Sequence, residues 1–460
     1  MKKNGAFRRV AALMAALSIT VSLAAPAFAD TYYIDYGDIT ITKNEDGSQT
    51  IEQGGDKWTD KAGEETVITT SNTVITTLES DLEGPAAEDS DFGPVVEDNY
   101  QSAQPEDAEE PKDADQPESA EEPKSSDRQE SADQQAALAA APAGATPVNP
   151  KDDGFWGNTI TVINNFADKV LNLTLKDVKI DVSDTDDKAA LSVQGDGNVE
   201  IELDGNNELK SGWHRAGLEK NASEAEGTLT LKDENKEAGS LTAKGGGSAA
   251  GIGGSYNGYH KNNGTKNIII TGGTVNATGG QCGAGIGGGS DGGGKNITIS
   301  GGTVTAAGGN YGAGIGGGDY GSGEDITING GTVTATGGFR GAGIGGGGSG
   351  GGGKNITINS GTVNATGGED GAGIGGGHEG SGEHITINGG AVDAKGGNQG
   401  AGIGGGGSGI GGKNITIKGG TVNAAGGKGS AGIGGGLGGS GENITINGGA
   451  VDAKGGNQGA

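Results

Sequence analysis

The sequence contains few aromatic residues, a single cysteine and no proline in its last two thirds. Aromatic residues make up 4% of the 460 residues, which is too little for a large conventional core. Cys282 has no second cysteine to pair with, so disulfides cannot stabilise the fold. All ten prolines lie at or before Pro150. Their absence beyond that point suits stacked strands whose backbone N–H groups all donate to a neighbour.

Positive charge is also scarce, and its absence excludes one class of partner. The formal net charge is −29, and between Glu79 and Asp133 there are 20 acidic residues against Lys112, Lys124 and Arg128. Phosphate binding needs a clustered basic surface, so we expect no nucleic-acid partner. Ser-His-Asp, zinc-ligand and paired-carboxylate patterns are missing as well. The sequence therefore predicts a protein that is not an enzyme and has no cofactor.

The first 150 residues divide into three segments. Residues 1–29 combine a basic start, an apolar run and Ala27-Phe28-Ala29, which is typical of a secretory signal peptide and predicts a secreted, extracellular protein with no membrane span in the mature chain. Residues 30–80 are rich in alternating β-type patterns and predict an N-terminal cap or first rung. Residues 81–150 are an acidic Pro/Glu/Asp/Ala segment with too little apolar surface to fold, and we expect a disordered linker.

Residues 151–460 consist of glycine-rich repeats. The isoleucine of an Ala-Gly-Ile-Gly motif recurs at intervals of 34, 29, 29, 30, 29 and 30 residues. Two further short strands, typified by Asn-Ile-Thr-Ile at 296–299 and Thr-Val-Thr-Ala at 303–306, recur with the same period. A repeat of this length indicates a solenoid. The recurring isoleucines are Ile252, Ile286, Ile315, Ile344, Ile374, Ile403 and Ile433.

Three short strands per 29–30-residue coil predict an all-β, parallel β-helix. Alternation along each strand would place Ile297 and Ile299 inside and Thr298 outside, so that identical residues of successive coils form columns. We take the helix as right-handed, from the rule for parallel crossovers. The residue before Asn-Ile-Thr-Ile alternates in sign from coil to coil after its first two copies, which we interpret as a register-setting row.

Two sets of positions vary between coils and are the candidate binding residues. One set precedes Gly-Ala-Gly-Ile, and the other follows Gly-Ile-Gly. Exposed rings beside Arg, Asn and Asp fit a sugar, because a ring stacks on its C–H surface and polar groups bind its hydroxyls; neutral variation at loop tips is the competing interpretation. The candidates are Trp213, His214, Arg215, Tyr256, Tyr259, Tyr311, Tyr320, Phe339 and Arg340. Glu369, Asp370 and Glu379 are weak candidates for a Ca²⁺ site.

The repeats also resemble a known family. Gly-Ala-Gly-Ile-Gly-Gly-Gly, Asn-Ile-Thr-Ile and Gly-Gly-Thr-Val-Asn-Ala-Thr-Gly-Gly, together with the segments at 173–183, 195–207 and 216–221, resemble secreted glycine-rich carbohydrate-binding domain proteins of anaerobic Firmicutes. The resemblance covers about residues 158–460. It implies a right-handed, pectate-lyase-like β-helix that binds acidic or neutral polysaccharide without cleaving it. The long acidic insert departs from this pattern, and the resemblance assigns no binding residues.

Three functions remain open at this point. We expect a monomeric, secreted or cell-surface module that binds a polysaccharide or cell-surface glycan without catalysis. The alternatives are a structural stalk or adhesin that displays other domains, and a polysaccharide lyase-like enzyme. Because residues 455–460 copy residues 396–401 and then stop within a repeat, we expect the natural protein to continue, with a cap and an attachment to the cell wall.

Overall fold

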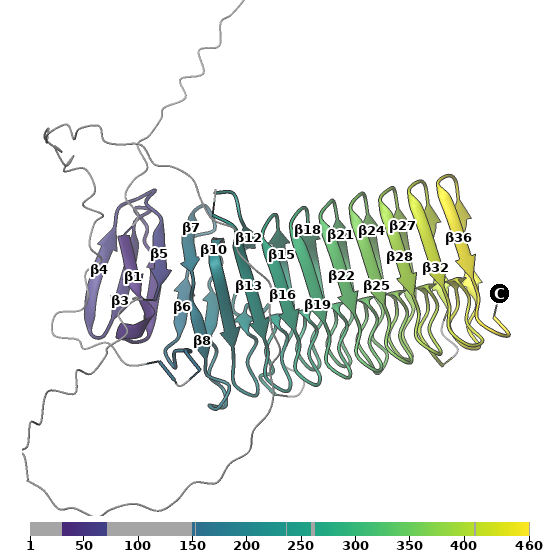
Figure 1. Cartoon of the computed structure of the whole chain (residues 1–460), viewed down its shortest axis with the longest axis horizontal. Helices are drawn as coiled ribbons and strands as arrows, with labels where there is room; N and C mark the ends of the chain where they lie inside the picture. Colours follow the sequence, from purple (N-terminus) through teal and green to yellow (C-terminus); the bar gives the residue numbers. More distant parts are fainter. Residues whose placement is uncertain are drawn as a thin grey trace, which may run out of the picture. The chain divides into compact units, whose positions relative to one another are not determined.

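The computed structural model describes residues 30–70 and 150–459, except 152, 236, 259–262, 409 and 410. The expected signal peptide and most of the expected linker lie outside these residues. The described part of the chain is a right-handed parallel β-solenoid, as predicted. Its coils follow one another in sequence order from teal to yellow in Figure 1.

Each regular coil contributes one strand to each of three sheets, except that the sheet A strand of the last two coils is divided into two short strands. Sheet A contains β1 (Asp30–Tyr33), β5 (Thr66–Thr69), β7 (Val170–Lys176), the first half of β10 (Asn198–Lys210), β12 (Leu229–Lys232), β15 (Thr265–Ile270), β18 (Gly294–Ile299), β21 (Gly323–Ile328), β24 (Gly353–Ile358), β27 (Gly382–Ile387), β30 (Gly412–Lys413), β31 (Thr416–Ile417), β34 (Gly441–Glu442) and β35 (Thr445–Ile446).

Sheet B contains β2 (Ile39–Lys43), β3 (Gln49–Gln53), β4 (Asp56–Asp60), β6 (Ile160–Ile163), β9 (Leu191–Gln194), β11 (Leu218–Glu219), β14 (Ile252–Gly253), β17 (Ile286–Gly287), β20 (Ile315–Gly316), β23 (Ile344–Gly345), β26 (Ile374–Gly375), β29 (Ile403–Gly404) and β33 (Ile433–Gly434). From β11 onward its strands are only two residues long.

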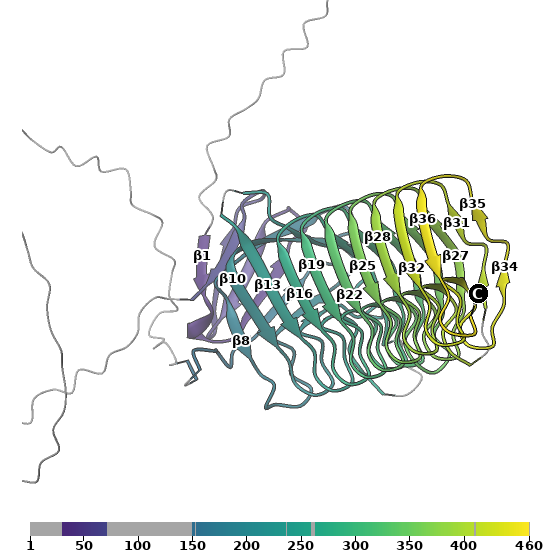
Figure 2. The same ribbon diagram turned by 45° about the vertical axis from the view of Figure 1, so that its right-hand side comes forward.

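Sheet C contains β8 (Lys179–Asp181), the second half of β10, β13 (Gly239–Lys244), β16 (Thr274–Thr278), β19 (Thr303–Ala307), β22 (Thr332–Thr336), β25 (Thr362–Thr366), β28 (Ala391–Lys395), β32 (Thr421–Ala425) and β36 (Ala450–Lys454). Figure 2 shows these strands side by side on one face.

Aliphatic columns form the core. Ile297 pairs in register with Ile326, and Val304 pairs in register with Val333. Each of these four side chains is fully buried. Strand alternation explains this arrangement, because every second residue of a strand points to the same face. Stacked identical residues thus supply a continuous core without aromatic rings.

The N-terminal strands join the same sheets. β1 and β5 extend sheet A in parallel, and β2 pairs in parallel with β6 in sheet B. β3 and β4 continue beyond β2 as antiparallel strands, and a 3-10 turn at Ile34–Tyr36 connects β1 to β2. No helix among the described residues is long and apolar enough to cross a membrane.

The alternating charges form fewer ion pairs than the sequence pattern suggests. Lys295 lies 3.7 Å from Glu324, and Lys413 lies 3.5 Å from Glu442. Glu324 and Lys354 occupy paired register positions as well. These side chains are about half exposed, so each pair contributes only a few tenths of a kcal/mol.

Candidate functional site

The two variable sets lie in the loops that flank sheet B. We call the loop before the Ile-Gly strand loop 1 and the loop after it loop 2. Each loop has an inner variable residue that is buried or half-buried and an outer one, which is exposed in most coils of loop 1 and in some coils of loop 2. In loop 1 the outer residues include Trp213, Asn310 and Phe339, and the inner ones His214, Tyr311 and Arg340; in loop 2 the inner residues include Tyr256, Asp319 and His378, and the outer ones Asp291, Tyr320 and Glu379.

Backbone hydrogen bonds bring the two loops together. The N–H of Asp319 donates to the carbonyl of Cys282 at 2.8 Å, and the N–H of His378 donates to the carbonyl of Arg340 at 2.8 Å. In each case an inner loop 2 residue bonds to an inner loop 1 residue of the preceding coil. The sheet B strand is so short that both loops reach the same edge of the solenoid. We call this edge the ridge.

Hydrogen bonds between coils also order the loop tips. The N–H of Arg340 donates to the carbonyl of Asn310 at 3.0 Å, and the N–H of Tyr320 donates to the carbonyl of Gly348 at 3.0 Å. Repetition of these bonds from coil to coil extends the ladder into the loops. The variable side chains are therefore presented by an ordered backbone, as a preorganised binding surface requires.

The centre of the ridge carries both exposed rings and charged groups. Phe339 is 55% exposed and Tyr320 is 65% exposed. The guanidinium carbon of Arg340 lies 5.7 Å from the centroid of the half-buried Tyr311 ring, within reach of a cation–π interaction. Burial raises the pKa of the Asp319 carboxyl above its usual range, while Ser349, Tyr320 and the positive charge of Arg340 oppose the rise.

Three buried polar atoms of the described residues have no hydrogen-bond partner, and all three lie in the ridge loops. They are Asp319 Oδ1, His378 Nδ1 and Ser430 Oγ. The nearest carboxylate oxygen to His378 Nδ1 is Asp370 Oδ2 at 3.5 Å, which is too long for a strong hydrogen bond. Buried polar groups are normally paired, so these three atoms lie beneath the loops with a desolvation cost that no hydrogen bond offsets.

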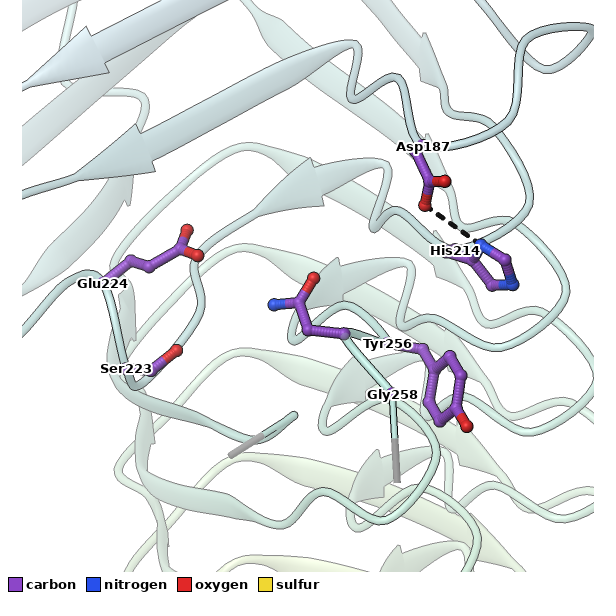
Figure 3. A pocket seen from close by; sticks show the side chains of 7 residues that line it. Asp187, His214, Ser223, Glu224, Tyr256 and Gly258 are labelled. Carbon is purple, nitrogen blue, oxygen red and sulfur yellow. Dashed lines mark hydrogen bonds and ion pairs between the residues drawn. The ribbon is translucent and has the colours of Figure 1, made fainter. Parts of the chain in front are cut away.

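A cleft of about 740 Å³ lies where the regular coils begin. Figure 3 shows Asp187, His214 and Tyr256 on one side of it and Ser223 and Glu224 on the other. His214 Nδ1 lies 3.0 Å from Asp187 Oδ1, and the rings of His214 and Tyr256 are 5.7 Å apart between centroids. The cleft thus combines an aromatic side chain with acidic and imidazole groups.

The structure separates the sequence candidates into groups. Trp213, His214, Tyr256, Tyr311, Tyr320, Phe339 and Arg340 lie on the ridge. Arg215 is engaged in structure, since it contacts the buried Glu219 carboxylate at 3.1 Å. Tyr259 lies outside the described residues. Glu369 accepts a hydrogen bond from Asn398 and Asp370 accepts one from Gln399.

The described residues contain no group of three or more His, Cys, Asp or Glu side chains arranged to hold a metal ion. Glu379 instead lies 3.6 Å from His378 Nε2.

Sequence reasoning did not single out Asp187, Ser223 and Glu224. These residues precede the regular repeat, so no periodic variation marks them. Only folding brings them to the same cleft.

Comparison with known proteins identifies the repeat itself. No curated protein and no solved structure matches the chain. A family model described as a beta helix repeat matches residues 268–290, 297–319, 326–353, 356–378, 385–407 and 415–437. Each matched segment runs from sheet A through sheet C and sheet B toward loop 2. The regular part of this solenoid is therefore similar, coil by coil, to the beta helix repeat family.

Proposed function

We propose that this protein is an exported, non-catalytic module that binds a polysaccharide or cell-surface glycan along the ridge. The observation that carries the proposal is the pair of exposed rings, Phe339 and Tyr320, beside a polar strip on an ordered backbone. Tyr311, Arg340 and Asp319 belong to that strip. Rings stack on sugar faces and the polar groups bind hydroxyls, so both requirements of sugar binding are met at one edge.

Repetition along the solenoid fits an extended ligand. Successive coils are spaced by one strand separation, about 4.8 Å, so the ridge presents a new set of side chains at each step. A polymer lying along it would contact several coils at once. Because each contact adds to the others, a modest affinity per coil can give useful binding overall. A stalk or adhesin that only displays other domains would not need this surface.

Binding can be tested with a glycan array probed with residues 30–460. The double variant Phe339→Ala/Tyr320→Ala should weaken binding of any captured glycan by roughly thirtyfold or more, since each aromatic ring that becomes buried on binding contributes up to ~2 kcal/mol. Thr303→Ala/Thr332→Ala is the matched control, because both threonines are exposed on sheet C. Absence of binding to every glycan, or equal losses in the two variants, would leave the stalk as the better interpretation.

A second candidate is a lyase-like enzyme acting in the cleft, which is favoured by Asp187, His214 and Glu224 lining one cavity. Proton abstraction from a sugar would need such a base. The test is whether the protein releases unsaturated oligosaccharides from pectic and host polysaccharides, which is measured as an increase in the ultraviolet absorbance of the products. If the wild type releases such products and His214→Ala does not, the protein is a lyase-like enzyme and the non-catalytic proposal is wrong.

A further inference from the structure

We propose that residues 30–69 form a cap that docks on the rest of the solenoid through its own contacts, and that the cap binds a second copy of this chain in the same way. The surface that receives the cap is the first coil, residues 156–176, which contains β6 and β7. The acidic segment joins the cap to the first coil along the chain. Their docking does not depend on glycan binding.

The chain leaves the solenoid and returns to it at one corner. Thr69, the last residue of β5, pairs with Lys176, and Trp156 forms a parallel bridge with Ile180. In the next coil only three residues join Lys176 to Ile180, whereas residues 70–155 join Thr69 to Trp156. The acidic segment is therefore an insertion in the turn from sheet A to sheet C of a single coil. It links the cap covalently to a coil on which the cap already stacks.

The cap docks on the first coil as one coil docks on the next. β5 pairs in parallel with the last four residues of β7, and β2 pairs in parallel with β6. Ile41 and Ile68 of the cap are fully buried in one hydrophobic cluster with Val162 and Leu173 of the first coil. Such an interface resembles a protein core cut in two, which is typical of permanent complexes.

Two polar side chains of the cap bind the backbone of the first coil. Gln49 Oε1 accepts from the N–H of Asn172 at 3.0 Å, and Gln49 Nε2 donates to the carbonyl of Asn172 at 3.2 Å, so the amide imitates a strand partner. Asp38 Oδ1 accepts from the N–H and the hydroxyl of Thr159, at 2.7 and 3.1 Å. Because hydrogen bonds are directional, these contacts fix the register in which the cap docks.

A second copy of this chain offers an identical first coil. Residues 71–149 can span roughly 250 Å when fully extended, which is enough to reach it. The same contacts form whether the cap comes from the same chain or from another one, as in domain swapping. At low protein concentration the chain's own cap is favoured by its high effective concentration, and exchange between copies increases with concentration.

Cutting the acidic segment separates docking from covalent attachment. A recognition site for a sequence-specific protease is inserted between Glu110 and Pro111 of residues 30–460, and the folded protein is cut. We expect the cap fragment to co-elute with the solenoid fragment in size-exclusion chromatography at ~1 µM and to separate only in denaturant. Release of the cap fragment without denaturant would mean that covalent attachment holds the cap, and the proposal would be wrong.

Hybrid complexes test binding to a second copy. Isotope-labelled cut protein is mixed with unlabelled cut protein, and native mass spectrometry detects complexes of one labelled and one unlabelled fragment. We expect hybrids to form as caps exchange between copies. If intact complexes persist but no hybrids form, even in a variant whose cap is held less tightly, the cap does not bind a second copy.

Asp38→Ala is that variant. It should speed hybrid formation roughly tenfold, because it removes a carboxylate that bonds to the backbone of Thr159 in the first coil. Glu52→Ala is the matched control, since it removes the same charge from an exposed position whose ion pair, with Lys57, lies within the cap. Equal exchange rates in the two variants would contradict the docking contacts and overturn the proposal.

Discussion

At the scale of single residues, the glycines of the repeat serve two distinct needs. Gly345, in the sheet B strand, has a φ of +133°, which favours glycine. Gly338 in loop 1 is different, because an added Cβ would lie 1.6 Å from the carbonyl oxygen of Gly309 in the preceding coil. The sequence led us to expect positive φ at the corners together with close stacking. In the structure Gly345 meets both needs, since an added Cβ there would also lie 2.0 Å from the carbonyl oxygen of Gly375, whereas Gly338 has the close approach alone.

The close approach at Gly338 predicts a strong steric effect. Gly338→Ala should destabilise the solenoid by about 1–3 kcal/mol, because the neighbouring backbone has to move. Gly157→Ala is the control, since its nearest neighbour would be Lys151 Cε at 3.9 Å. Denaturant midpoints of the two variants should differ clearly. Equal midpoints would show that the coils can separate locally without a measurable cost.

Lys220 is a buried charge that the repeat does not explain. It is 1% exposed, and its Nζ donates to the carbonyls of Ala225 at 3.0 Å and Lys266 at 2.8 Å. Burial lowers the pKa of this lysine from 10.5 to about 8, and the nearby Lys266 charge adds to the shift. Its charged form is therefore less favourable in the folded than in the unfolded chain.

This shift predicts that stability rises with pH in a defined window. Between pH 8 and 10.5 the unfolded chain holds the lysine proton while the folded chain releases it, so ΔG of unfolding should increase. The full gain is roughly 3 kcal/mol, from ~1.36 kcal/mol per pKa unit. Stability measured from pH 8 to 10 in wild type and Lys220→Met should show the steeper rise in wild type. Parallel curves would contradict the assignment.

At the scale of one element, the strands of sheet A carry a bend that the sequence did not reveal. Asn296, in β18, has a φ of 52° and donates from Nδ2 to Asn267 Oδ1 at 2.7 Å. The same position bends in successive coils, and asparagine tolerates this left-handed conformation better than most residues. The other members with positive φ are Asn267, Asp325, Asn355, His384, Asn414 and Asn443.

The bend can be separated from its hydrogen bond by mutation. Asn296→Ala should lower the free energy of unfolding by roughly 2 kcal/mol or more. The variant loses the hydrogen bond, and alanine also pays the cost of a left-handed backbone conformation. Asn296→Gly should lose only the bond, at about 1 kcal/mol, since glycine accepts this φ. Chemical denaturation measures the difference. An alanine variant as stable as the glycine variant would indicate that the backbone straightens without cost.

At the scale of the whole molecule, the two ends of the described solenoid differ. At one end β3 and β4 extend sheet B beyond β2 as antiparallel strands, and Ile41 and Ile51 are fully buried. In the last coil Ile444 is 38% exposed and Ile446 is 52% exposed, although the equivalent Ile415 and Ile417 are fully buried. Each coil contacts only its neighbours, so an end coil has half the stacking partners of a central one.

This asymmetry predicts graded hydrogen exchange. In residues 30–460, amides of β34, β35 and β36 should exchange fastest among the strands, and those of β18, β21 and β24 slowest, because local opening needs the fewest broken contacts at an unstacked coil. Mass-spectrometric exchange of peptic fragments resolves the coils. Uniform protection from β18 to β36 would instead indicate one cooperative unit.

The sequence by itself determined the solenoid, its period and its core. Alternation at Ile297 and Ile299 and recurrence at Ile326 and Ile328 are local and periodic properties, and stacking converts them directly into buried columns. The two variable rows were also visible as departures from the repeat. Their role in binding stays a prediction.

Only the tertiary structure decided how these rows are arranged. The two-residue strand of sheet B allows loop 1 and loop 2 to bond to each other across coils, which places Asp319 beside Cys282 and Arg340 over Tyr311. The cleft with Asp187 and Glu224 also joins segments outside the regular period. Such distances depend on loop geometry and hydrogen bonds between coils, which a repeat pattern along the chain does not encode.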